Sequence, residues 1–114
     1  MSDPATCEVV GRWRITGSDM WDRDFLDLAN PARFIVDDAG HGEIEFGAVQ
    51  LDLDVEYGRQ IAFFRFAGLD EGDEVWGDGS AEIADDGTLE IEIHFVDGDE
   101  PTLTAYRETS SAAC

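Results

Sequence analysis

Apolar and polar residues alternate one by one along most of this chain, and no other feature limits its possible folds as strongly. The run LEIEIHFV at residues 89–96 is the clearest case, and VQLDLDVEY at 49–57 follows the same rule. Alternation with a period of two is typical of a β-strand with one buried and one exposed face. The pattern predicts strands over residues 8–16, 33–38, 42–48, 49–57, 60–68, 75–84, 89–96 and 101–107.

Short connections join these expected strands, which indicates an antiparallel order in which chain neighbours pair. Asp-Asp-Gly-Thr at 85–88 is typical of a hairpin, because Asp-Gly tolerates the positive φ of a type I′ turn. The apolar phase slips by one residue beside Gly47, which predicts a bulge or a sharp bend there. Because closure would remove long apolar sheet edges, the sequence predicts an all-β, up-and-down antiparallel barrel of seven or eight strands.

One segment, SDMWDRDFLDLANP at residues 18–31, breaks the alternation. Trp21, Phe25 and Leu28 recur there at i, i+4 and i+7, which is the spacing of one helical face. Pro31 would end such a helix, because proline lacks the backbone N–H that a further turn needs. We therefore expect one short helix between the first and second strands.

The chain has 114 residues, enough for one domain with a single core. We expect this domain at 8–107, with a flexible N-terminus at 1–7 and a flexible tail at 108–114. No signal-peptide pattern and no apolar run long enough to span a membrane are visible, so a cytoplasmic location is expected. In that compartment Cys7 and Cys114 are expected to be reduced thiols.

Acidic residues dominate the charge, because 27 Asp and Glu stand against seven Arg and no Lys, giving a formal net charge of −20. Such a surface repels phosphate backbones and anionic lipids, so neither a nucleic acid nor a membrane is an expected partner. Cationic ligands and basic peptides remain compatible with it, as does adaptation to high salt. Neither a Cys-x-x-Cys motif nor a zinc-like Cys and His spacing is present, and we expect no metal and no cofactor.

Gly11 and Trp13 on the first expected strand are matched by Arg107 on the last one. This Gly-x-Trp and Arg combination resembles the signature of the calycins, the lipocalin and fatty-acid-binding-protein barrels. The resemblance implies that the Arg107 guanidinium stacks on the Trp13 ring and seals one end of the barrel. The first and last strands are neighbours in a closed meander, so this contact is geometrically reasonable.

Further motifs extend from residue 11 to residue 107, namely MWDRD, GHGEIEFGAV, FAGLDEGDE, HFVDGD and AYR. Together with Gly-x-Trp they resemble a set of small uncharacterised bacterial proteins. The chain departs from that pattern at GDGSAE, where an Arg and a Trp are expected near Asp78 and Ser80. The resemblance supports a fold and implies no activity.

Two acidic segments are candidate binding regions. Trp21, Asp22 and Asp24 lie on the expected helix near the expected mouth of the barrel, where the carboxylates would orient a ligand or simply solvate and cap the helix. The run LDEGDE at 69–74 is expected to be an acidic surface loop, because its spacing does not match a calcium-binding EF-hand.

Three further ligand-binding candidates are Phe64, Trp76 and His94. Adjacent strand residues point to opposite faces, so one of Phe63 and Phe64 is expected to be exposed, whereas Trp76 is expected in the core. His94 shares a strand face with two glutamates. It is a surface residue if that face meets solvent, and it is part of an acid/base pair if that face lines a polar interior.

These observations favour a binding protein over an enzyme. The leading expectation is a barrel that holds a small apolar or amphipathic molecule in its interior. The alternative is an interaction module that acts through its acidic face or forms a homodimer through exposed aromatic side chains. A hydrolase or isomerase that uses Asp22, Asp24 or His94 is the least favoured class, and no catalytic residue is assigned. A connected cavity inside the barrel would separate the first hypothesis from the second.

Overall fold

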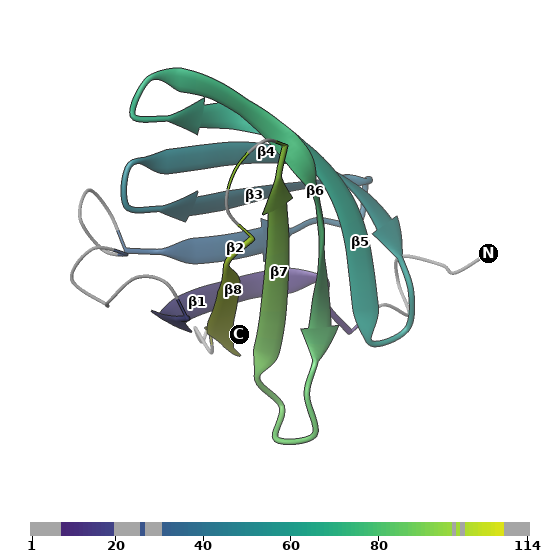
Figure 1. The fold of residues 1–114 in the computed structure, drawn as a ribbon. Helices are drawn as coiled ribbons and strands as arrows, with labels where there is room; N and C mark the ends of the chain where they lie inside the picture. The colour runs from purple at the N-terminus through teal and green to yellow at the C-terminus, as the bar shows by residue number, and fades with distance from the viewer. Residues whose placement is uncertain (1–7, 20–25, 27–30, 97, 99, 109–114) are drawn as a thin grey trace.

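Eight antiparallel strands close into a single barrel in the computed structural model of this chain (Figure 1). The structure describes residues 8–19, 26, 31–96, 98 and 100–108. In chain order the strands are β1 (Gly11–Ser18), β2 (Arg33–Val36), β3 (His41–Phe46), β4 (Val49–Tyr57), β5 (Ile61–Asp70), β6 (Asp73–Ile83), β7 (Leu89–Phe95) and β8 (Thr102–Arg107).

Pairing between the first and last strands closes the sheet. Each strand pairs with the next one along the chain, and β1 pairs with both β2 and β8. Trp13 therefore lies opposite Phe34 of β2 on one side and opposite Arg107 of β8 on the other. In Figure 1 the two strands lie side by side although they come from opposite ends of the chain. The predicted all-β, up-and-down antiparallel barrel is confirmed, with eight strands.

Apolar side chains fill the interior of the barrel. Every second residue of β4 and β7 is buried, as the alternation predicts. No polar or charged side chain of the described residues is buried. Removing this apolar surface from water is the main favourable term in folding, at about 25 cal/mol per Å². The most completely buried strand residues include Trp13, Ile15, Phe34, Ile44, Phe46, Leu51, Leu89, Ile91, Ile93 and Leu103.

Two glycines of β6 make room for aromatic rings in the interior. A Cβ atom on Gly77 would collide with the His94 carbonyl oxygen and lie 2.9 Å from Cζ of Phe66. A Cβ atom on Gly79 would collide with the Glu92 carbonyl oxygen and lie 2.7 Å from Cζ of Phe64. The Phe64 ring centroid lies 6.1 Å from that of Phe34 and 6.4 Å from that of Phe66. These rings therefore occupy the space inside the barrel beside β5 and β6.

The phase slip beside Gly47 marks a tight turn between β3 and β4. The register pairs Phe46 with Val49, which leaves only Gly47 and Ala48 in the connection. Gly47 has a φ of 54°, in the left-handed region that glycine adopts without a steric penalty. The predicted sharp bend is therefore a two-residue hairpin turn.

The expectation of a loop at 69–74 is wrong. Strand β5 continues to Asp70 and β6 begins at Asp73, so only Glu71 and Gly72 form the turn. These two residues have φ values of 53° and 89°, which is the requirement of a type I′ hairpin turn. Acidic residues have low intrinsic strand propensity, but pairing across the hairpin overrides that preference here.

The hairpin expected at 85–88 is present, with a different turn. The Gly87 N–H donates to the Ala84 carbonyl at 3.0 Å, and Gly87 has a φ of 86°. Asp86 does not share the positive φ that a type I′ turn needs at both central residues. Its carboxylate instead accepts hydrogen bonds from the Thr88 N–H at 3.0 Å and the Thr88 hydroxyl at 2.7 Å.

Most of the segment expected to form a helix, 18–31, lies outside the described residues. Its expected first residue, Ser18, is instead the last residue of β1, because pairing with Leu103 extends that strand. The segments expected to be flexible, 1–7 and 108–114, also lie outside the described residues, apart from the first residue of the second segment.

Candidate functional site

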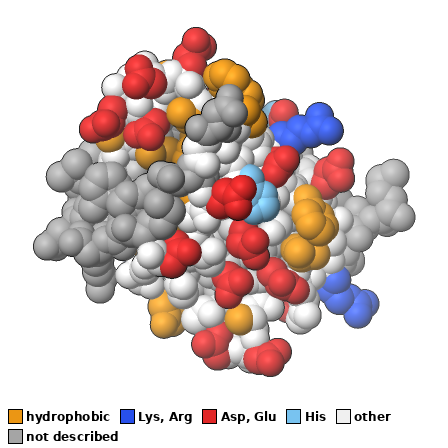
Figure 2. Space-filling model, in the orientation of Figure 1, with side chains coloured by type: hydrophobic (Ala, Val, Ile, Leu, Met, Phe, Trp, Pro, Cys, Tyr) orange, Lys and Arg blue, Asp and Glu red, His pale blue; other side chains and the backbone are white. Residues whose placement is uncertain are grey.

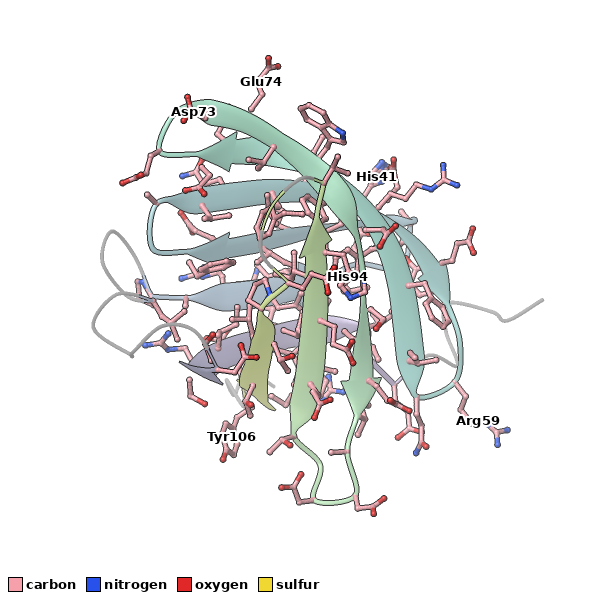
Figure 3. All side chains as sticks on the ribbon, viewed as in Figure 1. His41, Arg59, Asp73, Glu74, His94 and Tyr106 are labelled. Atoms are coloured by element: carbon pink, nitrogen blue, oxygen red, sulfur yellow. The ribbon has the colours of Figure 1, made fainter. Side chains whose placement is uncertain are left out.

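The structure brings two of the ligand-binding candidates, Phe64 and His94, to the lining of one groove and places Trp76 outside it. Phe64 points into the interior and is 3% exposed, whereas Trp76 is 56% exposed on the outer face of β6. The prediction that Trp76 belongs to the core is wrong, because β6 turns its odd-numbered residues inward. His94 lies on the outer side of β7, where it meets solvent (Figure 3). The other three candidates lie outside the described residues: Trp21, Asp22 and Asp24.

A groove of about 560 Å³ runs over the outer face of four neighbouring strands, and we call it the β4–β7 groove. Its volume is within the range of small-molecule binding sites. Most of the side chains come from alternate, outward positions of β4, β5, β6 and β7, and the inward Val55 and Phe64 also line the groove. The lining residues that bear charge or an aromatic ring are Asp54, Glu56, Phe63, Phe64, Arg65, Asp78 and His94.

Charged and ionisable side chains form one row across the groove. Arg65 of β5 is the register partner of Asp54 on β4 and of Asp78 on β6. Asp78 is in turn opposite His94 on β7, and Asp54 is opposite His41 on β3. Directly opposite residues of antiparallel strands have Cβ atoms about 4.5–5.5 Å apart. The barrel thus brings together five residues from five strands, with a histidine at each end of the row.

Negative charge exceeds positive charge in the groove. Asp54, Glu56 and Asp78 supply three carboxylates, whereas Arg65 supplies one guanidinium. Within the described part of the chain, Arg65 forms no ion pair with the two aspartates that flank it. Figure 2 shows the same imbalance over the face in view, where acidic side chains are common and basic ones are few. The groove is therefore suited to a positively charged ligand.

His94 contacts two carboxylates at the edge of the groove. Its Nδ1 lies 3.3 Å from Oδ1 of Asp78, and its Nε2 lies 3.8 Å from Oε1 of Glu92. A His–Asp pair serves nucleophilic catalysis only when a hydroxyl or thiol is within hydrogen-bond reach of the histidine. Ser80 lines the same groove, but no hydrogen bond among the described side chains joins it to His94.

Phe63 supplies apolar surface at the groove. Its side chain is 52% exposed while the adjacent Phe64 is buried, so the prediction that one of the two faces outward is confirmed. The register places Phe63 between Glu56 of β4 and Ser80 of β6. An aromatic ring beside a carboxylate can contact both the apolar body and the charged group of an organic cation.

Sequence reasoning does not single out Asp54 or Arg65, because both belong to the ordinary polar phase of their strands. Asp78 and Ser80 belong to GDGSAE, the segment near which the sequence analysis expects an Arg and a Trp, and both line the groove.

In the described ranges no group of three or more His, Cys, Asp or Glu side chains is arranged to hold a metal ion. The same ranges contain no helix with the length and hydropathy needed to cross a membrane.

The chain matches no protein-family model, no curated protein and no solved structure.

Proposed function

We propose that this is a non-enzymatic binding protein that takes an amphipathic organic cation in the β4–β7 groove. The proposal depends on one observation, the placement of three carboxylates and the half-exposed ring of Phe63 in a single groove of about 560 Å³. The matching ligand has an ammonium or guanidinium group and an apolar body of small-molecule size.

Packing inside the barrel supports a site on the outer face rather than in the interior. Phe34, Phe64 and Phe66 are each less than 5% exposed, and the Phe64 ring packs near both of the others. Gly77 and Gly79 lie close to two of these rings, because a Cβ atom there would be 2.9 Å from Cζ of Phe66 and 2.7 Å from Cζ of Phe64. A ligand inside would have to displace these rings, whereas a ligand in the groove displaces only water.

Two interactions favour a cation over other ligands of the same size. Hydrogen bonds between an ammonium group and a carboxylate are charge-assisted and about twice as strong as neutral ones. A cation near the face of the Phe63 ring gains about 0.5–1 kcal/mol more at an exposed site. A neutral ligand makes neither contact, and an anion is repelled by Asp54, Glu56 and Asp78.

Titration of the ¹⁵N-labelled protein with 2-phenylethylammonium tests the proposal, because this cation carries an aromatic ring. Neutral 2-phenylethanol and anionic 3-phenylpropanoate are matched ligands of nearly the same shape. We expect the cation alone to cause saturable shifts at the backbone amides of Phe63, Ser80 and His94. Equal binding of all three ligands, or shifts centred on interior residues such as Phe34 and Ile91, would show that the groove is not the cation site.

Two substitutions localise the binding. Asp78→Asn should weaken the affinity about tenfold, which corresponds to the loss of one charge-assisted hydrogen bond. Asp52→Asn is the matched control, because Asp52 is an outward residue of β4 that carries the same charge but does not line the groove. An equal loss in both variants would indicate diffuse attraction by the net charge.

We further infer that the barrel is calycin-like. The inference is supported by the arrangement of Gly11, Trp13 and Arg107, in which Cζ of Arg107 lies 4.2 Å from the centroid of the Trp13 ring. It concerns the fold and does not place a ligand.

A further inference from the structure

A cluster of exposed apolar side chains lies beside the groove on the same outer face. Trp76, Leu69 and Val96 are 56%, 45% and 52% exposed. With the exposed Ala67 they form what we call the Trp76 patch. None of these four residues lines the β4–β7 groove.

The four residues of the Trp76 patch are neighbours in the sheet. Ala67 of β5 is the register partner of Trp76 on β6. Leu69 lies opposite Glu74, and Glu74 and Trp76 are successive outward residues of β6. Val96, just after β7, donates its backbone N–H to the Trp76 carbonyl at 2.9 Å. The patch is therefore continuous across β5, β6 and the end of β7.

The indole of Trp76 takes no part in the packing of the barrel core. This side chain belongs to the outward phase of β6, opposite to the phase that contacts the interior. Contiguous exposed apolar patches mark interaction sites, and tryptophan is enriched among the residues that contribute most to protein–protein binding. Trp76 is thus suited to anchor a protein partner.

Carboxylates surround the patch. Asp52 of β4 lies opposite Ala67, and Glu74 lies opposite Leu69. Figure 3 shows Asp73 and Glu74 at the outer end of the β5–β6 hairpin. Four acidic residues stand at that end of the hairpin: Asp70, Glu71, Asp73 and Glu74.

We propose that the Trp76 patch docks a basic segment of a partner protein, in which Arg or Lys side chains flank at least one apolar side chain. Charge favours a basic partner over a second copy of this chain. A second copy of this chain would bring its own net charge of −20 and the same carboxylates, and the two surfaces would repel each other. A basic segment pairs with Asp52, Glu74 and the hairpin end while its apolar side chain covers the indole. This inference is independent of the groove, because it uses different side chains.

Two short synthetic peptides test the inference on the full chain, one that combines Arg with Leu and one that has Glu in place of each Arg. The basic peptide should shift the indole N–H resonance of Trp76 in ¹H–¹⁵N spectra, with the assignment made from Trp76→Phe. The acidic peptide should not. The affinity for the basic peptide should fall as NaCl is raised, because the screening length shortens from about 10 Å at 0.1 M to about 3 Å at 1 M.

A matched pair of aromatic variants separates docking on the patch from general attraction to an acidic surface. Trp76→Ala should remove saturable binding of the basic peptide. Tyr106→Ala should leave the binding unchanged, because Tyr106 is equally exposed but lies on β8. Binding that survives Trp76→Ala would overturn the proposal.

A matched pair of charge variants tests the carboxylates. Asp73→Asn with Glu74→Gln removes two charges at the patch, and Glu90→Gln with Glu92→Gln removes two charges from the outer face of β7. The first double variant should weaken the basic peptide's binding severalfold and the second should not. An equal effect would mean that only the net charge attracts the peptide, which contradicts the proposal.

Sedimentation of the protein without peptide tests the competing occupant. We expect a monomer at the concentrations used for the titration. A dimer that Trp76→Ala dissociates would show that a second copy covers the patch, which would overturn the basic-segment proposal. Trp76→Ala should still bind 2-phenylethylammonium, so a failure of the patch and a failure of the groove give different results.

Discussion

A Cβ atom on Gly11 would lie 2.6 Å from Nη1 of Arg107, so the guanidinium of the last strand fills the space that this glycine leaves open. The same guanidinium lies over the Trp13 ring, with its Cζ 4.2 Å from the ring centroid. It also donates hydrogen bonds to the carbonyl oxygen of Val10, at 3.1 Å, and to that of Glu8. The expected contact between Trp13 and Arg107 is confirmed, and it joins the two strands that close the barrel.

Arg107→Ala should lower the free energy of unfolding by about 1–2 kcal/mol, because it removes the cation–π contact and the packing of the aliphatic stem. Arg107→Lys should recover part of the loss, since lysine keeps the charge but lacks the planar fork that reaches two carbonyl groups. Urea denaturation measures both variants. If Arg107→Ala were as stable as the unmodified protein, the contact would contribute nothing to closure.

Gly11→Ala should also destabilise the fold. Its Cβ would collide with the Arg107 guanidinium, and Gly11 has a φ of 137°, which side chains rarely adopt. In the Arg107→Ala background the collision is absent and only the backbone cost remains. A double-mutant cycle should therefore show the two changes to be less destabilising together than the sum of their separate effects. Additive effects would mean that the two residues do not interact.

Tyr57→Phe should lower the free energy of unfolding by about 1–2 kcal/mol, because it removes two hydrogen bonds. The Tyr57 hydroxyl donates to the Asp37 carbonyl at 2.5 Å and accepts from the Gly40 N–H at 2.8 Å, so it ties β4 to the β2–β3 turn. Tyr106→Phe is the control, since Tyr106 is exposed on β8. Faster hydrogen exchange of the Gly40 amide in Tyr57→Phe, but not in Tyr106→Phe, would show that the loss of stability arises at this turn. Equal stability of the two variants would refute the prediction.

Hydrogen bonds from the Thr88 hydroxyl and N–H lower the pKa of Asp86 below its ordinary value. Thr88→Val should raise this pKa, because it removes the larger of the two causes. A ¹³C NMR titration of the aspartate carboxyl carbons measures the change. The pKa of Asp37, lowered by the backbone N–H groups of Ala39 and His41, is the internal control and should not move.

The lowered pKa values of Asp37 and Asp86 also predict how the stability of the fold changes with pH. Asp37 and Asp86 bind protons less readily in the folded state, so they stabilise the fold above the ordinary pKa of aspartate. That contribution is lost as the pH falls through their lower, folded-state values. Asp37→Asn with Asp86→Asn should therefore lose stability less steeply over this acidic range. Urea denaturation at a series of pH values measures the slope, and an unchanged slope would contradict the assignment.

Glu82 and Glu90 face each other directly on β6 and β7, and both point outward. Opposed like charges destabilise a sheet, so Glu82→Gln should raise the free energy of unfolding by about 0.3–1 kcal/mol. Glu92→Gln removes the same charge opposite Ser80 and Thr102, where no such repulsion exists. The difference between the variants should shrink in molar NaCl, which should also raise the melting temperature of the unmodified protein. A difference that persists in high salt would need another cause.

Alternation alone was enough to show which face of most strands is buried. Leu89, Ile91 and Ile93 point into the barrel as predicted, and Phe63 is exposed beside the buried Phe64. Side-chain direction in a strand follows from local backbone geometry, so a period of two reveals it before any pairing is known. Short connections then predicted that consecutive strands pair, and the long apolar edges of an open sheet favoured closure into a barrel.

The sequence alone did not show which side chains of β6 point into the barrel. Gly77 and Gly79 interrupt its apolar pattern, and Val75 and Trp76 are adjacent apolar residues of which only one can face inward. Pairing with β5 places Ala67 opposite Trp76 and turns the indole outward. The tertiary structure therefore decided that Trp76 belongs to the surface.

The register of strand pairing decided which side chains are neighbours on the outer face. Asp54, Arg65, Asp78 and His94 come from four strands, and only the pairing of β4 through β7 places them in one row. The interior excludes water and accepts only apolar side chains, so its composition is visible in the sequence. Solvent accepts any polar side chain at any outward position, so the sequence by itself determined which residues of most strands face outward. The closed barrel decided which of these outward side chains lie next to one another.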